Sequence, residues 1–210
     1  PTASGAKESP ALPIPVATGL LARDGREMAP TRVLMLEQRR QEFRFENLTE
    51  RPIASVLRNF SAPVKLHFEQ SAADLALLLA HDTDPFNRQD AGQRLATRLL
   101  LAQAAEAESG AEQEQALVAA WRAVLQDSRL DPSLAAWTLV LPDEEVLFEE
   151  MESPDPVALH HAVTQLERRL SRQLAEFLGQ KLTSYQRNEP YAPTPEQIGP
   201  RRLRNRCLVL

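Results

Sequence analysis

The chain has 210 residues, and its 24 Lys and Arg against 29 Asp and Glu give a formal net charge of −5, which excludes a polycationic nucleic-acid-binding domain. Hydrophobic residues at 43% and charged residues at 25% are close to the average for globular proteins and exclude a disordered chain. No apolar run approaches the ~18 residues that a membrane-spanning helix needs, so neither a nucleic acid nor a membrane is an expected partner. The single cysteine, Cys207, forms no internal disulfide, which favours a reducing, cytoplasmic location.

The first third of the chain shows the alternation of apolar and polar residues that is typical of β-strands. A hairpin turn is predicted at Asp24-Gly25. Pro13 and Pro15 predict an edge position for the strand before that turn, because proline donates no hydrogen bond to a ladder. Five short strands predict a small antiparallel sandwich with a marginal core. The predicted strands are 12–20, 32–37, 41–46, 53–57 and 64–68.

After Glu69 the apolar period changes from two to about 3.6, which indicates helices. Several predicted helices begin with an N-cap residue followed by proline at the first helical position. The second, third and longest of them are expected to end near Gly110, Asp127 and Tyr185. The expected starts are Ser71, Asp84-Pro85, Glu112, Asp131-Pro132, Leu141-Pro142, Asp155-Pro156 and either Thr194-Pro195 or the residues after Pro200.

These patterns predict an α+β chain in two segments. An antiparallel β-sandwich domain is expected over 1–70, and an all-α domain of helical hairpins in a superhelical array over 71–210. The formal charge divides as +2 for the first segment and −7 for the second, which supports two different domains. No clean repeat period is visible, so the pattern does not demonstrate a regular solenoid. The chain starts without Met and stops inside an apolar helical pattern, which predicts an excised piece.

The candidate metal and acid/base residues are better explained by structural roles than by chemistry. The four histidines lack a His or Glu partner at zinc-binding spacing. Adjacent helical residues diverge by about 100°, so neighbouring histidines do not converge on one metal. An acidic cluster that resembles an acid/base pair or a calcium site is better explained as a solvated surface at a helix start. The histidines are His67, His81, His160 and His161, and the cluster is Asp143, Glu144, Glu145, Glu149, Glu150, Glu152 and Asp155.

Binding and nucleophile candidates receive similar interpretations. Trp121 and Trp137 are predicted to pack in the core rather than to stack on a ligand. Cys207 is predicted to be a small buried hydrophobe rather than a reactive thiol. A group of four arginines is predicted to form a solvated or ion-paired face rather than a phosphate site. Those arginines are Arg201, Arg202, Arg204 and Arg206. We therefore assign no catalytic, cofactor-binding or metal-binding residue.

Five segments carry recognisable motifs: 57–66, 81–91, 131–136, 155–159 and 202–208. They resemble bacterial aminopeptidase N, a zinc aminopeptidase family of the gluzincin class. They occur in the family's order and cover essentially the whole chain. The second is similar to H-x-x-[DN]-x-F-x-R-W-[DE]-A, with Gln89 where Trp is usual. The others resemble the end of the family's β-sandwich domain, D-P-[AS]-L-[AV]-A, D-P-x-A-[IL] and R-x-L-[KR]-N-x-[CA]-L.

The resemblance implies that 1–70 is the sandwich domain without its first strand and that 71–210 is the first part of the C-terminal helical domain. In that family, two His of an H-E-x-x-H helix and a Glu from a following helix hold zinc in an upstream domain. This chain contains neither that motif nor the G-x-M-E-N loop that holds the substrate's amino end. The piece alone is thus expected to be inactive and to bind no cofactor, although its parent hydrolyses N-terminal residues from peptides.

The implied role is architectural: the sandwich braces the catalytic domain, and the helices help to cap the active-site cavity and restrict peptide access. The expected partners are the missing catalytic domain, the remaining C-terminal helices and the peptide substrates of the parent. The alternative is a free-standing adaptor that binds protein partners through the concave face of its helical hairpins.

Overall fold

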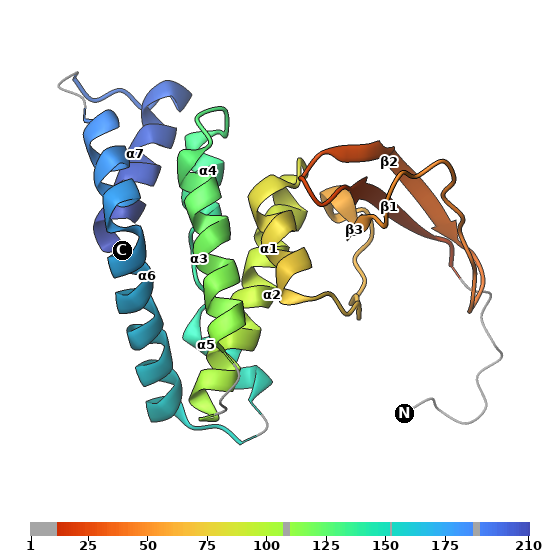
Figure 1. The fold of residues 1–210 in the computed structure, drawn as a ribbon, viewed down its shortest axis with the longest axis horizontal. Coiled ribbons are helices and arrows are strands. Elements are labelled where there is room, and N and C mark those ends of the chain that lie inside the picture. The colour runs from red at the N-terminus through yellow and green to blue at the C-terminus, as the bar shows by residue number, and fades with distance from the viewer. Residues whose placement is uncertain (1–11, 107–109, 152, 187–189) are drawn as a thin grey trace. The chain divides into compact units, whose positions relative to one another are not determined.

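The computed structural model describes residues 12–106, 110–151, 153–186 and 190–210. The chain divides into two compact units, Pro1–Phe68 and Glu69–Leu210. The first unit contains a three-stranded antiparallel sheet in the order β2-β1-β3, and helices make up the second (Figure 1). An antiparallel β domain followed by a helical domain, as the sequence predicts, is therefore confirmed.

The sheet grows from the hairpin of β1 (Ile14–Leu21) and β2 (Glu27–Leu36). At the predicted turn, the Ala22 N–H donates to the Arg26 carbonyl at 2.8 Å, and Gly25 has a φ of 84°, a backbone conformation that favours glycine. β1 is the central strand, so the prediction of an edge position is wrong. Pro13 precedes β1, and Pro15 is tolerated within it because β3 (Ile53–Val56) pairs only with the distal half of β1, from Thr18 to Leu21.

Two of the five predicted strands, 41–46 and 64–68, are not strands in the part of the chain that the structure describes. The guanidinium of Arg32 lies 5.5 Å from the Phe45 ring centroid, so the first of these segments makes a side-chain contact without joining the ladder. Val64 and Leu66, in the second, are exposed. Apolar alternation predicts an extended chain, but a strand also needs a partner, and the pattern does not supply one.

A buried arginine packs against the sheet and hydrogen-bonds to its strands. Arg58 is only 2% exposed, and its guanidinium donates to Glu27 Oε1 at 2.6 Å, Thr31 Oγ1 at 2.8 Å and Ser55 Oγ at 2.9 Å. The group lies directly over Gly19 of β1, where a Cβ would collide with it. Glycine at this position therefore makes room for the cation, and the ion pair with Glu27 offsets the cost of burying it.

Seven helices are described in the second unit, and most begin where the sequence predicts. The side chains of Ser71, Asp84, Asp131 and Asp155 each accept a hydrogen bond from a backbone N–H of the first turn. The helices are α1 (Ala72–His81), α2 (Pro85–Ala104), α3 (Ala111–Gln126), α4 (Pro132–Thr138), α5 (Glu144–Glu150), α6 (Pro156–Ser184) and α7 (Pro195–Val209).

Two helix starts and one helix end differ from the prediction or decide between its alternatives. α5 begins at Glu144 with Asp143 as its N-cap, so Pro142 precedes the helix rather than occupying its first turn. α7 begins at Pro195 and continues through Pro200, which decides between the two predicted starts. α2 ends at Ala104, whereas the predicted stop at Gly110 follows residues 107–109, which lie outside the described residues.

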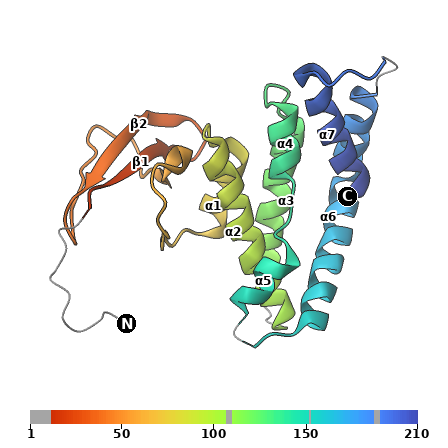
Figure 2. The same cartoon turned by 180° about the vertical axis from the view of Figure 1, so that it is seen from behind.

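The helical core consists mainly of leucines on facing stripes. α1 packs on α2 and α3, α6 packs on α2, α3, α5 and α7, and α4 packs on α7 (Figures 1 and 2). α1 and α2 approach closely at Gly92, where an added Cβ would lie 2.9 Å from a methyl group of Leu79. None of the described helices is long and apolar enough to cross a membrane.

The two tryptophans differ in burial. Trp121 of α3 is 1% exposed, which confirms its predicted core position, whereas Trp137 of α4 is 47% exposed, so its predicted core position is wrong. On this short helix the buried residues are Ala135, Ala136 and Thr138, and the intervening Trp137 is left at the surface.

Candidate functional site

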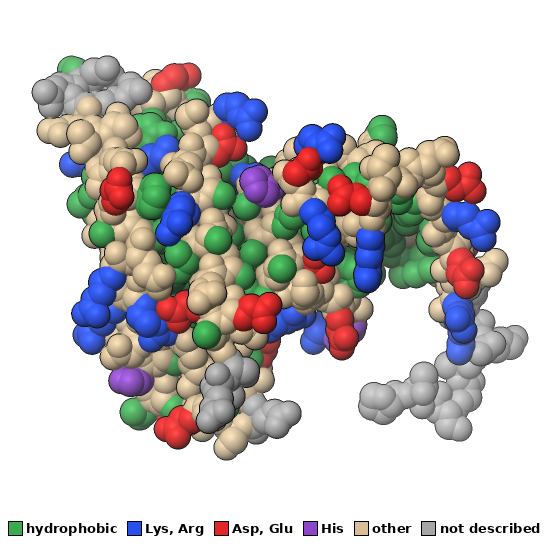
Figure 3. All heavy atoms as spheres, in the orientation of Figure 1, with side chains coloured by type: hydrophobic (Ala, Val, Ile, Leu, Met, Phe, Trp, Pro, Cys, Tyr) green, Lys and Arg blue, Asp and Glu red, His purple; other side chains and the backbone are tan. Residues whose placement is uncertain are grey.

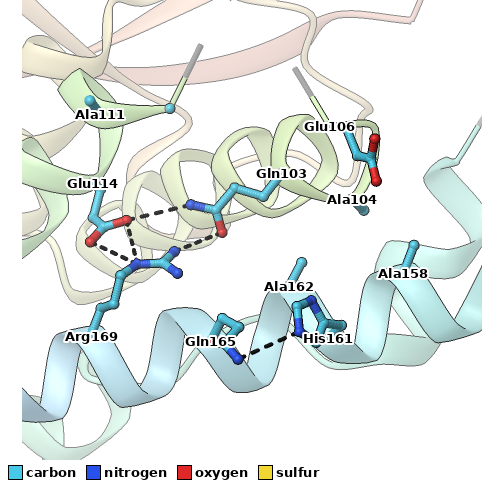
Figure 4. Close-up of a pocket in the computed structure, with 11 residues that line it drawn as sticks. Gln103, Ala104, Glu106, Ala111, Glu114, Ala158, His161, Ala162, Gln165 and Arg169 are labelled. Carbon is cyan, nitrogen blue, oxygen red and sulfur yellow. Dashed lines mark hydrogen bonds and ion pairs between the residues drawn. The ribbon is translucent and has the colours of Figure 1, made fainter. Parts of the chain in front are cut away.

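A polar cleft of about 530 Å³ lies where α2, α3 and α6 meet in the helical unit. Side chains of α6 face the end of α2 and the start of α3 across it (Figure 4). Small residues form part of the described walls of the cleft. Those small residues are Ala104, Gly110, Ala111, Ala158 and Ala162.

Arg169 of α6 is the centre of a hydrogen-bonded network at one end of the cleft. Its Nε donates to the Glu114 oxygens at 3.0 and 2.9 Å, and its Nη2 donates to Gln103 Oε1 at 3.0 Å. The side-chain amides of Gln103 and Gln173 also donate to Glu114, at 3.4 and 3.2 Å. Three helices thus meet at one ion pair (Figure 4). Because three side chains donate to Glu114, its carboxylate is an anchor for Arg169 rather than a free base.

The other end of the cleft carries His161, Gln165 and Glu106. The amide nitrogen of Gln165 lies 3.5 Å from His161 Nε2, and the Glu106 side chain is exposed beyond the end of α2. Figure 4 places Glu106 near Ala104 and away from Arg169. The polar side chains of the described lining are Gln, Glu, His and Arg.

The four histidines are exposed, and the two adjacent ones make different contacts. His160 pairs with Glu144 at 2.9 Å, whereas the adjacent His161 lines the cleft. Among the described residues, no group of three His, Cys, Asp or Glu side chains is arranged to hold a metal ion. A tetrahedral zinc site needs three or four such ligands, so the residues described here do not fit one. The assignment of no catalytic, cofactor or metal residue stays a prediction.

The described members of the acidic cluster are exposed. Glu144 and Glu145 lie in the first turn of α5, where the helix dipole favours carboxylates. Glu152 lies outside the described residues. Glu144, Glu145 and Glu149 border a groove of about 460 Å³ between α5 and α6. The groove is also lined by Phe148 and the buried Leu159. On the face of the helical unit shown in Figure 3, acidic and basic side chains are interspersed rather than segregated.

The arginines of α7 only partly match the predicted solvated face. Arg206 is half-buried and its Nε donates to the Leu139 carbonyl at the end of α4, at 2.7 Å. Burial lowers the pKa of Arg206, and the nearby Glu167 opposes that shift. Arg201 lies over the Tyr191 ring at 4.3 Å. The Arg206 contact satisfies the carbonyl end of α4 from α7, so this arginine helps to hold the two helices together.

Cys207 is 4% exposed, which confirms the prediction of a small buried hydrophobe. Burial raises the pKa of its thiol from 9.0 to about 11. The group is therefore protonated at neutral pH and unsuited to nucleophilic attack.

Two polar groups were not predicted. The first is Arg88, which is 5% exposed and donates to the carbonyls of Asp82 at 3.0 Å and Ala80 at 2.8 Å, the last residues of α1 and its cap. Burial lowers the pKa of Arg88, whereas Asp127 and Asp82 raise it. The second is the Arg169 network. Its signal was the spacing of four residues at every fourth position of α6: His161, Gln165, Arg169 and Gln173.

Comparison with known families gives two adjoining matches. Residues 72–210 match a domain of unknown function with ARM repeats, DUF3458_C, and residues 1–69 match a domain of unknown function with an Ig-like fold, DUF3458. The chain belongs to this family. Its two matched domains meet close to the boundary between the compact units, at Phe68 and Glu69.

Relatives of this DUF3458 chain carry the name aminopeptidase N. Aminopeptidase N of Caulobacter vibrioides is 38% identical over 191 residues, which are 91% of this chain and 22% of the relative. Aminopeptidase N of Escherichia coli is 36% identical over 84% of this chain and 20% of the relative. A solved structure of Legionella pneumophila aminopeptidase A in complex with aspartic acid has a TM-score of 0.81 at 31% identity, covering 94% of this chain and 24% of that one.

The chain is therefore similar to one segment of these aminopeptidases, and it spans about a fifth of the length of the curated relatives that it matches. The predicted resemblance to this family is confirmed.

Proposed function

We propose that this chain is the noncatalytic Ig-like and ARM-repeat portion of a zinc-dependent aminopeptidase N that removes N-terminal residues from peptides. Within the parent, the β unit braces the catalytic domain, and the helices help to cap the active-site cavity and limit peptide entry. Its partners are the catalytic domain and further helices of the same parent. The single cysteine, Cys207, supports a reducing, cytoplasmic setting.

The observation that carries this proposal is the asymmetry of the match. The similarity extends over 91% of this chain but over only 22% of the Caulobacter relative, so most of an aminopeptidase N lies in sequence that has no counterpart here. The described residues include no arrangement of three metal-ligating side chains. Zinc, which polarises the attacking water in peptide hydrolysis, would belong to that other sequence.

An architectural role also fits the way the polar groups are used. Arg58 and Arg88 are buried cations that donate to neighbouring strands or helix ends, and Arg169 joins three helices. Each is held by two or more hydrogen bonds, which favours a stiff support over a reactive group. A stiff helical array restricts access to a cavity because it does not yield to a large substrate.

A chimera tests the proposal. The matching segment of the Caulobacter vibrioides aminopeptidase N, at 38% identity, is replaced by this chain, and hydrolysis of L-alanine p-nitroanilide is measured together with bound zinc. We expect a kcat/KM within about tenfold of the unmodified relative, or ~1.4 kcal/mol in barrier height, and one equivalent of zinc. The isolated chain should neither hydrolyse the anilide nor retain zinc after dialysis.

The control is the same relative with a Gly/Ser linker in place of the segment, which should lose activity or fail to accumulate. A folded chimera that binds zinc but hydrolyses nothing would contradict the proposal. So would zinc-dependent turnover by the isolated chain that survives purification. Peptide entry is read from the ratio of rates on a tripeptide and a 20-residue peptide, which the chimera should preserve.

A further inference from the structure

The turn that follows β3 holds three non-glycine residues in the left-handed region of backbone conformation. The backbone φ is 63° at Leu57, 54° at Asn59 and 50° at Phe60. This region is unfavourable for residues that carry a Cβ and is tolerated best by Gly and Asn, so the leucine and the phenylalanine are strained. Such strain persists only where the surrounding contacts fix the backbone, and it often marks a segment with a role in conformational change.

The strained turn interrupts the sheet at a defined register. β3 pairs with β1 as far as Thr18, which lies opposite Val56, so one further antiparallel pair would place Leu57 opposite Ala17. The left-handed conformation of Leu57 turns the chain away at that point. The Ala17 N–H donates instead to Ser61 Oγ, at 2.9 Å. A side-chain hydroxyl thus takes the place of a ladder carbonyl where β3 ends, and the Ala17 N–H stays satisfied.

Contacts on both sides of the strained residues hold the turn in this conformation. On one side, the buried guanidinium of Arg58 donates to side chains of β2 and β3. On the other side, Ser61 accepts from β1, and the next residue, Ala62, is only 2% exposed. The segment is therefore tied to all three strands of the sheet.

We propose that residues 57–62 form a strap that closes the edge of β1 beyond the end of β3, and that this strap opens as one unit more readily than the sheet itself. Its strain lowers the free energy of opening, whereas the hydrogen bonds of Arg58 and Ser61 keep it closed. Opening releases the Ala17 N–H and lets the backbone at Asn59 leave the left-handed region. The inference goes beyond the proposed function, because it concerns the β unit of this chain alone and does not depend on the activity of a chimera.

Native-state hydrogen exchange of the 210-residue chain, followed by NMR, tests the strap through the Ala17 amide. Asn59→Gly and Asn59→Ala both remove the Asn side chain, so the difference between them reports the backbone conformation. Alanine is disfavoured at a φ of 54°, whereas glycine is not. We expect the Ala17 amide to exchange about fivefold faster in Asn59→Ala than in Asn59→Gly, equivalent to ~1 kcal/mol. Amides that pair β1 with β2 should differ by less than about twofold between the two variants.

Asn47 supplies the matched control, because it is an exposed asparagine of the same unit with a φ of 59°. Asn47→Gly and Asn47→Ala relieve or raise strain outside the strap, so they should give equal exchange at Ala17.

Thr31→Val tests the anchor, because it removes one acceptor of the Arg58 guanidinium at nearly constant side-chain volume. We expect it to accelerate exchange of the Ala17 amide at least about threefold. The proposal is overturned if the two Asn59 variants exchange alike at Ala17 or if Thr31→Val leaves Ala17 unchanged. It is also overturned if every amide of the sheet accelerates together with Ala17, since the β unit would then open only as a whole.

Discussion

Arg88 shows how a single buried cation supports a helix end. Its guanidinium donates to the carbonyls of Ala80 and Asp82 at the end of α1, where no helical N–H is left to pair with them. Replacing it by Met keeps an unbranched apolar stem but removes the guanidinium and with it both donors. We expect Arg88→Met to lower the free energy of unfolding of the helical unit by about 2–4 kcal/mol, measured by urea unfolding with tryptophan fluorescence.

Arg172→Met is the matched control for that variant. Arg172 lies on the exposed face of α6, and its guanidinium makes no hydrogen bond or ion pair with the side chains or carbonyls of the described residues. Its replacement should change the free energy of unfolding by less than about 0.5 kcal/mol. Equal effects of the two substitutions would mean that the guanidinium of Arg88 does not support the end of α1.

At the scale of residues, the sequence predicts burial better than it predicts polar partners. Cys207 and Trp121 are buried as their apolar neighbours indicate, but Trp137 is not, because a helix as short as α4 presents too little of a stripe to define its buried face. Arg88 and Arg169 were missed for a different reason. A pattern marks arginine as a surface residue, and only the fold reveals which carbonyls or carboxylates lie within its reach.

At the scale of elements, the helix starts depend on a few capping bonds. Asp155 accepts hydrogen bonds from the Val157 and Ala158 N–H groups at 3.0 and 2.9 Å and so begins α6, the longest helix described. Asp143 is the N-cap of α5 but makes no side-chain capping bond. Asp155→Ala should therefore lower the free energy of unfolding by about 1 kcal/mol, and Asp143→Ala by clearly less, in urea titrations followed by circular dichroism. Equal losses would show that charge near the helix dipole, rather than the capping bond, is what matters.

The contrast between helices and strands has the same physical origin. A helix start is a local event, so Asp84-Pro85, Asp131-Pro132 and Asp155-Pro156 identify α2, α4 and α6 within one residue. A strand is defined by its partner, which can be far away in sequence. The segment 64–68 has the alternation of a strand but pairs with no other strand among the described residues, and Pro15 lies in a central strand because β3 is too short to reach it.

At the scale of the whole molecule, the sequence predicted two dissimilar segments, and the chain divides into two compact units. The cleft could not be predicted, because it depends on three helices that are separated in sequence and meet only in the fold. The Arg169–Glu114 pair spans 55 residues, and no local pattern relates positions so far apart. The sequence shows the polar residues at every fourth position of α6, but it does not show that Gln103 and Glu114 are their partners.

The two units should differ in stability, because the β unit has a small core and leaves Val33, Met35 and Phe60 exposed, whereas the helical unit buries a continuous set of leucines. We expect amides of β1 to exchange through openings that cost at least about 2 kcal/mol less than those of α2, measured by hydrogen exchange and mass spectrometry.

Fully buried leucines in each unit provide matched variants. Leu21→Ala should speed exchange in the sheet and leave the midpoint of unfolding detected by tryptophan fluorescence unchanged, since Trp121 belongs to α3 and Trp137 to α4. Leu99→Ala should lower that midpoint by the equivalent of about 3 kcal/mol. Uniform acceleration of exchange throughout the chain by Leu21→Ala would instead identify a single cooperative unit.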